Sequence, residues 1–273
     1  RHKVRTMTEG TTQTLLASAL NGDRSSLARL LSHVERDPSA EAEIRASLAS
    51  MKADSVVIGV TGPPGAGKSS LISALLPHTT KSFDRTAVLA VDPSSPFSGG
   101  ALLGDRVRMQ NHGLGDRVLI RSMASKGESG GLARAAATAI QVLAACGWPL
   151  ILVETLGIGQ VELDVMDLAT AVAVVLNPGW GDTFQANKAG LTEAGDVFVI
   201  NKADKDCVQQ TRADLQDSLS LLQSPVPIQI FETIAVNEDG VAALWQGIET
   251  YLADAQTTGL QEQKQRTRRR RLL

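Results

Sequence analysis

The sequence predicts an α/β fold, in which a mostly parallel β-sheet is flanked by helices and preceded by a helical extension. Apolar segments of strand length alternate with helical stretches along most of the chain. Aromatic residues make up only 3% of the sequence but apolar residues make up 43%, so the core must consist of Val, Leu, Ile and Ala, as in parallel strands covered on both faces. A length of 273 residues suits one such domain with extensions.

The composition excludes several classes of protein. Charged residues make up 21% of the chain and the net charge is only -2, which is atypical of a disordered chain or a polyanion binder. Cys146 and Cys207 lie far apart with no Cys-x-x-Cys pair, so neither a disulfide framework nor a cysteine-rich metal site is expected. No run approaches the ~18 apolar residues of a membrane helix, and the start lacks a signal-peptide stretch. We expect a cytoplasmic protein that binds neither membrane nor nucleic acid.

Residues 1–54 are expected to form the helical extension. Apolar residues recur at three and four positions between residues 14 and 34, and the turn Asn21-Gly22-Asp23 interrupts them, which predicts two short helices. A third helix is expected to begin at Pro38, because proline is favoured in the first turn, and to continue through Leu48. A main domain over 55–254 and a basic segment over 255–273 complete the expected organisation.

Seven apolar segments within the main domain are predicted to be strands. Helical stretches separate them, so the strands should lie parallel, with helices on both faces of the sheet. These segments are 55–61, 86–91, 117–121, 149–153, 170–176, 196–200 and 226–231.

The first of these strands leads into a glycine-rich phosphate loop. The pattern Gly-x-x-x-x-Gly-Lys-Ser/Thr stands between a strand and an apolar helix, as the motif requires. Glycines let backbone N–H groups turn toward phosphates, Lys68 is placed to bridge the terminal phosphate oxygens, and the Ser69 hydroxyl is placed to bind magnesium. A glycine-rich turn that binds nothing is the alternative, but the pattern arises by chance in roughly one in a hundred such chains. The candidate residues are Gly62, Pro63, Pro64, Gly65, Ala66, Gly67, Lys68, Ser69 and Ser70.

A second motif, Asn201-Lys202-Ala203-Asp204, follows the sixth predicted strand and predicts a preference for guanine. The carboxylate of Asp204 is suited to accept both the N1–H and the exocyclic amine of guanine, and adenine offers no such pair. Asn201 is expected to tie loops together, and the stem of Lys202 to pack along the base. A solvated strand end is the alternative reading of these four residues alone. After the last predicted strand, Thr233 and Ala235 are weaker candidates, the Ala235 amide for guanine O6.

Carboxylates at or after other strand ends indicate a magnesium site. Asp92, Asp105 and Glu154 are the candidates, together with the Ser69 hydroxyl. Magnesium prefers oxygen ligands and keeps several waters, so not all three acids need to contact it. Each acid taken singly is equally explained as a helix cap or solvated turn, and Asp105 most of all. Glu154 is placed to hold a metal-bound water or to polarise the attacking one.

Taken together, these motifs resemble the MeaB-type (ArgK-like) GTPases, relatives of a bacterial protein once described as an arginine/ornithine transport kinase. The resemblance covers nearly the whole chain, including the helical extension. It is carried by Ala90-Val-Asp-Pro-Ser-Ser95, Gly99-Gly100 with Leu103-Gly-Asp105, Val153-Glu-Thr-Leu-Gly-Ile-Gly-Gln160, Pro178-Gly-Trp-Gly-Asp182 and Asn201-Lys-Ala-Asp204.

The resemblance implies a slow GTPase that binds an adenosylcobalamin-dependent acyl-CoA mutase, such as methylmalonyl-CoA or isobutyryl-CoA mutase, gates loading of its cofactor and protects it. It implies GTP or GDP and Mg²⁺ as ligands, nucleotide switches near 93–105 and 154–163, and a mutase-responsive loop over 177–188. Its catalytic candidates are Lys68, Glu154 and Asp182. Within the mutase-responsive loop, the coupling candidates are Asp182, Gln185 and Lys188.

Some positions depart from the family pattern. Trp180 replaces a small residue and is expected either to alter mutase specificity or to pack locally. The segments Thr183-Phe184 and Ser125–Glu128 also differ, as do Asn187 and Ile234. The Arg-rich segment 266–271 resembles the point where family members continue into a dimerisation arm, so a homodimer is an expectation from the resemblance.

Two alternatives compete with the chaperone hypothesis. A nickel-insertion GTPase is one, but that class presents Cys and His ligands, whereas this chain has only 4 His and unpaired Cys. A P-loop kinase is the other, but the sequence shows no separate substrate domain and its Asn-Lys-Ala-Asp motif disfavours ATP.

Overall fold

The computed structural model describes residues 12–51, 54–92, 114–124, 129–155, 164–179, 195–220 and 227–259. In these residues the chain forms one seven-stranded sheet in the order β3-β2-β4-β1-β5-β6-β7. Every neighbouring pair is parallel, which confirms the predicted fold class. The strands are β1 Val56–Thr61, β2 Thr86–Asp92, β3 Val118–Ala124, β4 Leu150–Thr155, β5 Ala171–Leu176, β6 Val197–Asn201 and β7 Gln229–Thr233.

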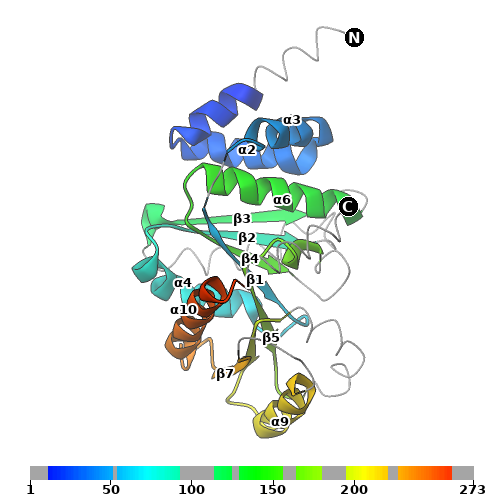
Figure 1. The fold of residues 1–273 in the computed structure, drawn as a ribbon, viewed down its shortest axis with the longest axis vertical. Helices are drawn as coiled ribbons and strands as arrows, with labels where there is room; N and C mark the ends of the chain where they lie inside the picture. Colours follow the sequence, from blue (N-terminus) through cyan, green and yellow to red (C-terminus); the bar gives the residue numbers. More distant parts are fainter. Residues whose placement is uncertain are drawn as a thin grey trace.

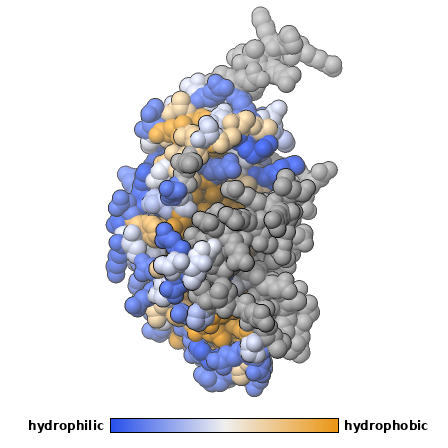
Figure 2. Space-filling view, in the orientation of Figure 1, coloured by the Kyte–Doolittle hydropathy of each residue, from blue (hydrophilic) through white to orange (hydrophobic). Residues whose placement is uncertain are grey.

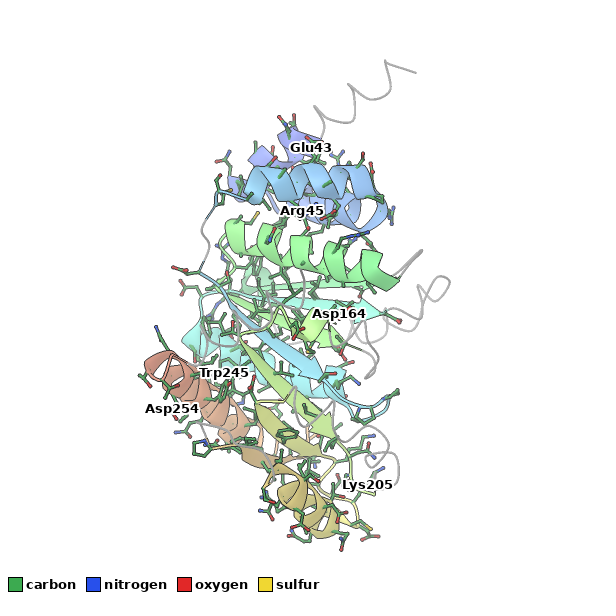
Figure 3. The ribbon with its side chains drawn as sticks, turned by 45° about the vertical axis from the view of Figure 1, so that its right-hand side comes forward. Glu43, Arg45, Asp164, Lys205, Trp245 and Asp254 are labelled. Atoms are coloured by element: carbon green, nitrogen blue, oxygen red, sulfur yellow. The ribbon has the colours of Figure 1, made fainter. Side chains whose placement is uncertain are left out.

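The sheet lies between two hydrophobic cores. Neighbouring strand residues point to opposite faces, so Val57 belongs to one core and Ile58 to the other. Helices α6 Ser129–Ala145 and α9 Val208–Leu219 cover the first face, and α4 Lys68–Ser82 and α10 Val241–Thr257 cover the second. Trp245, labelled on α10 in Figure 3, packs edge-on against Phe83 with the ring centroids 6.3 Å apart.

The amino-terminal helices add a further layer over α6. Residues 12–20 are helical, followed by α2 Arg24–Arg36 and α3 Pro38–Leu48. Asp23 and Asp37 cap the last two helices, each accepting two backbone N–H groups of the first turn. Figure 1 shows α2 and α3 stacked on α6 at one end of the molecule. Their apolar residues belong to the same hydrophobic core as those of α6, so these helices pack together with the sheet.

Trp148, just before β4, fills the junction between this layer and the sheet. The side chain is 2% exposed, and two guanidinium groups lie near its ring. The Cζ atoms of Arg24 and Arg85 are 5.6 and 5.2 Å from the ring centroid, within the range of cation–π attraction.

Two strands differ by three residues at one end from their predicted bounds, and the other strands differ by one or two. β3 continues to Ala124, three residues past the predicted end, because the polar residues Arg121 and Ser122 interrupt the apolar pattern although the backbone stays extended. β7 begins at Gln229, whereas the prediction began at 226. Pro227 precedes this strand, and a proline cannot donate to the ladder.

The described surface is mostly hydrophilic in the view of Figure 2, with hydrophobic residues gathered over the amino-terminal helices and near α9. Among the helices in the described ranges, none combines the length and the hydrophobicity that crossing a bilayer requires.

Candidate nucleotide-binding site

The predicted site lies at the carboxyl ends of the parallel strands. The central strand β1 pairs with β4 on one side and with β5 on the other. The connections that follow the neighbouring strands therefore run to opposite sides of β1. Open α/β sheets bind ligands at the carboxyl ends of the strands at such a point. The phosphate loop, residues 62–67, begins at this point and leads directly into α4.

Two glycines of the loop hold positions that no other residue suits. Gly62 has a φ of 136° and Gly67 a φ of 89°, both in the region where L side chains are strained. A Cβ at Gly62 would collide with the carbonyl oxygen of Val175, and one at Gly67 with the side-chain amide of Asn201. The glycines thus let the loop lie against β5 and the end of β6.

Lys68 is the first residue of α4 and points back into the loop. Its ammonium donates to the carbonyl oxygens of Gly62 at 2.8 Å and Pro63 at 2.9 Å. The residue is 5% exposed. The positive charge is therefore held under the loop, at the end of α4 where the helix dipole is also positive.

Asn201, at the end of β6, connects three segments. Its side-chain nitrogen donates to the carbonyl oxygen of Ala66 at 2.9 Å. Its side-chain oxygen accepts from the Thr233 hydroxyl and from the Ala235 amide, both at 3.1 Å. This confirms the expectation that Asn201 ties loops together. The Ala235 amide, which was expected to meet guanine O6, donates to Asn201 in this structure.

The next residues of this motif lie on the open side of the loop. Lys202 has a φ of 61°, and its ammonium donates to the carbonyl oxygen of Gly65 at 2.6 Å. Asp204 is exposed at the beginning of the segment that leads to α9. Lys205, labelled in Figure 3, marks this end of the molecule beside α9.

A second cluster of polar side chains lies on the other side of β1. The Ser69 hydroxyl donates to Oε1 of Glu154 at 2.6 Å. Glu154 on β4 pairs in register with Val60 of β1, and Asp92 ends the neighbouring strand β2. Both carboxylates are buried, with 2% and 4% of their surface exposed. The structure thus brings Ser69, Asp92 and Glu154 to one edge of the sheet, as predicted from strand ends.

Sequence reasoning missed one polar contact beneath this cluster. The Thr155 hydroxyl donates to the Thr61 hydroxyl at 3.1 Å, and both residues are buried at the ends of β4 and β1. A threonine at the end of each apolar strand was the available signal, but β-branched threonine is common in strands.

Other predicted site residues fall outside the described residues. They include the magnesium candidate Asp105 and the coupling candidates Asp182, Gln185 and Lys188, together with Trp180, Phe184 and Asn187.

The fold and the phosphate loop together define the class of protein, a P-loop nucleotide-binding protein, and the family match makes it a GTPase. The family model described as "Methylmalonyl Co-A mutase-associated GTPase MeaB" matches residues 27–273, and the chain belongs to this family.

Individual relatives agree with this assignment. A Pyrococcus abyssi protein provisionally named a GTPase is 42% identical over 261 residues, which cover 93% of this chain and 80% of the relative. A Caenorhabditis briggsae protein named methylmalonic aciduria type A homolog, mitochondrial, is 30% identical over 260 residues, covering 88% of this chain and 63% of the relative. The crystal structure of an LAO/AO transport system kinase has a TM-score of 0.74 at 24% identity, covering 96% of this chain and 82% of that one. This last likeness shows the fold.

Proposed function

We propose that this GTPase is a chaperone of an adenosylcobalamin-dependent acyl-CoA mutase, methylmalonyl-CoA mutase or a close relative such as isobutyryl-CoA mutase. It would gate the loading of the cofactor and protect the mutase from inactivation. The family description names a mutase-associated GTPase, and the Caenorhabditis briggsae relative is named for methylmalonic aciduria. These names support the mutase as partner.

The observation that carries the nucleotide assignment is the set of bonds made by Asn201. By joining Ala66 to the segment at Thr233 and Ala235, it places the phosphate loop beside two loops that would surround a base. The exposed carboxylate of Asp204 then accepts the two donors on one edge of guanine. An adenine there would leave the carboxylate without a matching pair of donors, and this disfavours ATP.

Lys68 and the backbone N–H groups of residues 65–69 would hold the phosphates, because Pro63 and Pro64 have no N–H to donate. The ammonium of Lys68 is already held by two carbonyl oxygens, so bound phosphates would exchange or share these bonds. Because phosphoryl transfer depends mainly on positioning and charge stabilisation, such a preformed cradle supplies much of what hydrolysis requires.

The buried acids beside the loop fit magnesium. Ser69, Asp92 and Glu154 present one hydroxyl and two carboxylates, which are the hard oxygen ligands that this ion prefers. Asp105 is a further candidate ligand. When bound, magnesium would neutralise phosphate charge. Glu154 would hold a water for attack on the terminal phosphate, directly or through the metal.

The response to the mutase would enter through the loop over 177–188, where Asp182 would contribute to catalysis, and Gln185 and Lys188 to coupling. The structure describes the first part of this loop. The Gly179 amide donates to the Thr211 hydroxyl at 3.3 Å, so the loop begins in contact with α9. That helix follows the Asn201–Asp204 motif, and this connection supports coupling between the partner and the nucleotide.

The two competing functions receive no support from the described residues. Within those ranges, no group of three or more His, Cys, Asp or Glu side chains is placed to hold a metal ion, so nothing there favours a nickel chaperone. The kinase name belongs to a structure at 24% identity, and that likeness shows the fold alone.

The decisive experiment measures GTP and ATP hydrolysis with magnesium, alone and with a candidate acyl-CoA mutase and its cobalamin. We expect slow turnover of GTP in preference to ATP, with acceleration by the cognate mutase. Lys188→Ala should reduce the acceleration, whereas Lys81→Ala, an exposed lysine on α4, should not. Indifference to both methylmalonyl-CoA and isobutyryl-CoA mutases would contradict the chaperone role, and preference for ATP would contradict the guanine assignment.

A further inference from the structure

Helix α2 is fastened to strand β3 at both of its ends. At its amino end, the Arg24 guanidinium donates to the Asp116 carboxylate at 2.7 Å and to the Val118 carbonyl at 2.8 Å. At its carboxyl end, the Glu35 carboxylate accepts from the Arg121 guanidinium at 2.5 Å and from the Ala124 amide at 3.0 Å. The helix therefore spans β3 from its first residue to its last.

The spacing of these contacts agrees with the geometry of the two elements. From Arg24 to Glu35 a helix rises about 16 Å, and from Val118 to Ala124 a strand rises about 20 Å. The two elements thus run in the same direction, and the two ends of α2 contact opposite ends of β3 through their side chains. Only the Glu35 end lies at the carboxyl edge, where the nucleotide site is.

Glu35 uses both of its carboxylate oxygens on β3. Oε2 accepts from Arg121 and Oε1 from Ala124, and the two side chains of the ion pair are only 16% and 18% exposed. β3 is the outermost strand on this side of the sheet. Glu35 therefore supplies the Ala124 amide with the acceptor that a further strand would otherwise provide.

The end of β3 is paired with a residue of the proposed magnesium site. Ala124 is the register partner of Asp92, and this is the last pair of the β2–β3 ladder. Asp92 is 4% exposed, so its carboxylate lies within the packed end of the sheet and moves with the strand that carries it. A contact that anchors Ala124 consequently anchors the strand end from which Asp92 projects.

We infer that Glu35 is a positioning residue for the magnesium–nucleotide site, acting through Ala124 and Asp92. The amino-terminal helices then contribute to metal binding without touching the metal. This inference rests on the assignment of Asp92 to magnesium in the proposed function, and it is independent of whether a mutase is the partner.

The test compares Glu35→Ala and Glu35→Gln with the unmodified protein. The affinity for a fluorescent GDP is measured over a magnesium titration and, separately, in EDTA. Supporting groups of this kind affect metal affinity by about tenfold, so Glu35→Ala should raise the half-saturating magnesium concentration by about that factor. The GDP affinity in EDTA should not change. The half-saturating magnesium concentration of Glu35→Gln should lie between those of the unmodified protein and Glu35→Ala. The amide oxygen of this variant still accepts from Ala124, but the side chain no longer forms an ion pair with Arg121.

Arg24→Ala is the matched control. It removes a comparable link between α2 and β3, together with the stacking on Trp148, but at the opposite end of the strand. We expect a lower thermal midpoint with an unchanged magnesium requirement.

An equal rise in the half-saturating magnesium concentration of Arg24→Ala would show that the effect is general destabilisation, and it would overturn the inference. An unchanged magnesium requirement in Glu35→Ala would also overturn it. Neither result depends on the mutase experiment, because GDP binding is measured without a partner.

Discussion

The nucleotide site has two corners that are constructed differently. At the base corner, Asn201 and Lys202 bond directly to backbone atoms of the phosphate loop. At the magnesium corner, Asp92 and Glu154 project from strand ends whose alignment is set by the register of the sheet. The geometry of the base corner therefore depends on single side chains. The geometry of the magnesium corner depends on the alignment of the strands, to which we infer that Glu35 of α2 contributes.

This difference predicts which substitutions should change folding stability as well as nucleotide binding, and which should change only metal-dependent functions. A substitution at the base corner removes a bond between loops, so folding stability and nucleotide affinity should fall together. A substitution at the magnesium corner should leave the loops joined and affect only functions that require the metal.

The largest effect is expected for Asn201→Ala. This residue is 2% exposed, and its removal leaves three hydrogen-bond partners unpaired: Ala66 in the phosphate loop, and Thr233 and Ala235 at and just after the end of β7. Each such loss costs about 1–3 kcal/mol, so we expect a loss of about 3 kcal/mol in the free energy of unfolding and of about 100-fold or more in GDP affinity. Urea unfolding and fluorescent GDP titration measure the two. Asn21→Ala, in an exposed turn, is the control. If Asn201→Ala lost GDP affinity but kept its free energy of unfolding, the expectation that the two fall together would be wrong.

An intermediate effect is expected for Ser69→Ala. The variant loses a proposed magnesium ligand and the bond to Glu154, and a hydrogen bond to a charged group contributes about 1.5–3 kcal/mol. We therefore expect GTP turnover to fall by about 10- to 100-fold, with GDP affinity in EDTA near that of the unmodified protein. Ser47→Ala, on the surface of α3, should change none of these. A large loss of GDP affinity in EDTA would place Ser69 with the phosphate cradle instead.

The smallest effect on the protein is expected from chemical labelling of its two cysteine thiols. Burial raises the pKa of the Cys146 thiol to about 11, against a smaller opposing effect of Arg85. At pH 8 only about 0.1% of this thiol is ionised, and the thiolate is the reactive form. Cys207, exposed beside the base corner at the start of α9, should therefore react first, and Cys146 only at higher pH or on unfolding. Cys207→Ser isolates the slow thiol, and equal rates for both thiols in the folded protein would contradict this expectation.

Much of the fold follows from local sequence because the strands are buried on both faces. Such strands are continuous apolar runs, and β4 and β5 are recognisable for that reason. Arg121 conceals the end of β3, since a charged residue inside an apolar run reads as the end of a strand. Its guanidinium pairs with Glu35, which is 86 residues away in the sequence.

The candidate site was predictable to a similar degree. Motifs at strand ends brought Ser69 and Glu154 together correctly because parallel strands share one carboxyl edge. The role of Glu35 was not predictable, since a glutamate near the end of an amphipathic helix looks like part of a solvated face. Its contacts depend on how α2 lies along β3, and the sequence of neither element specifies that.

The position of β1 in the centre of the sheet sets the order in which the protein can mature during synthesis. Val56 pairs with Leu150, and Ile58 pairs with Ala171, so the phosphate loop leaves the ribosome long before the strands on either side of β1. Contacts between such distant segments form slowly, because a long loop must close first. The capacity to hold a nucleotide is therefore acquired late, and a chain released before β5 would contain the complete loop sequence without the strand against which Gly62 lies.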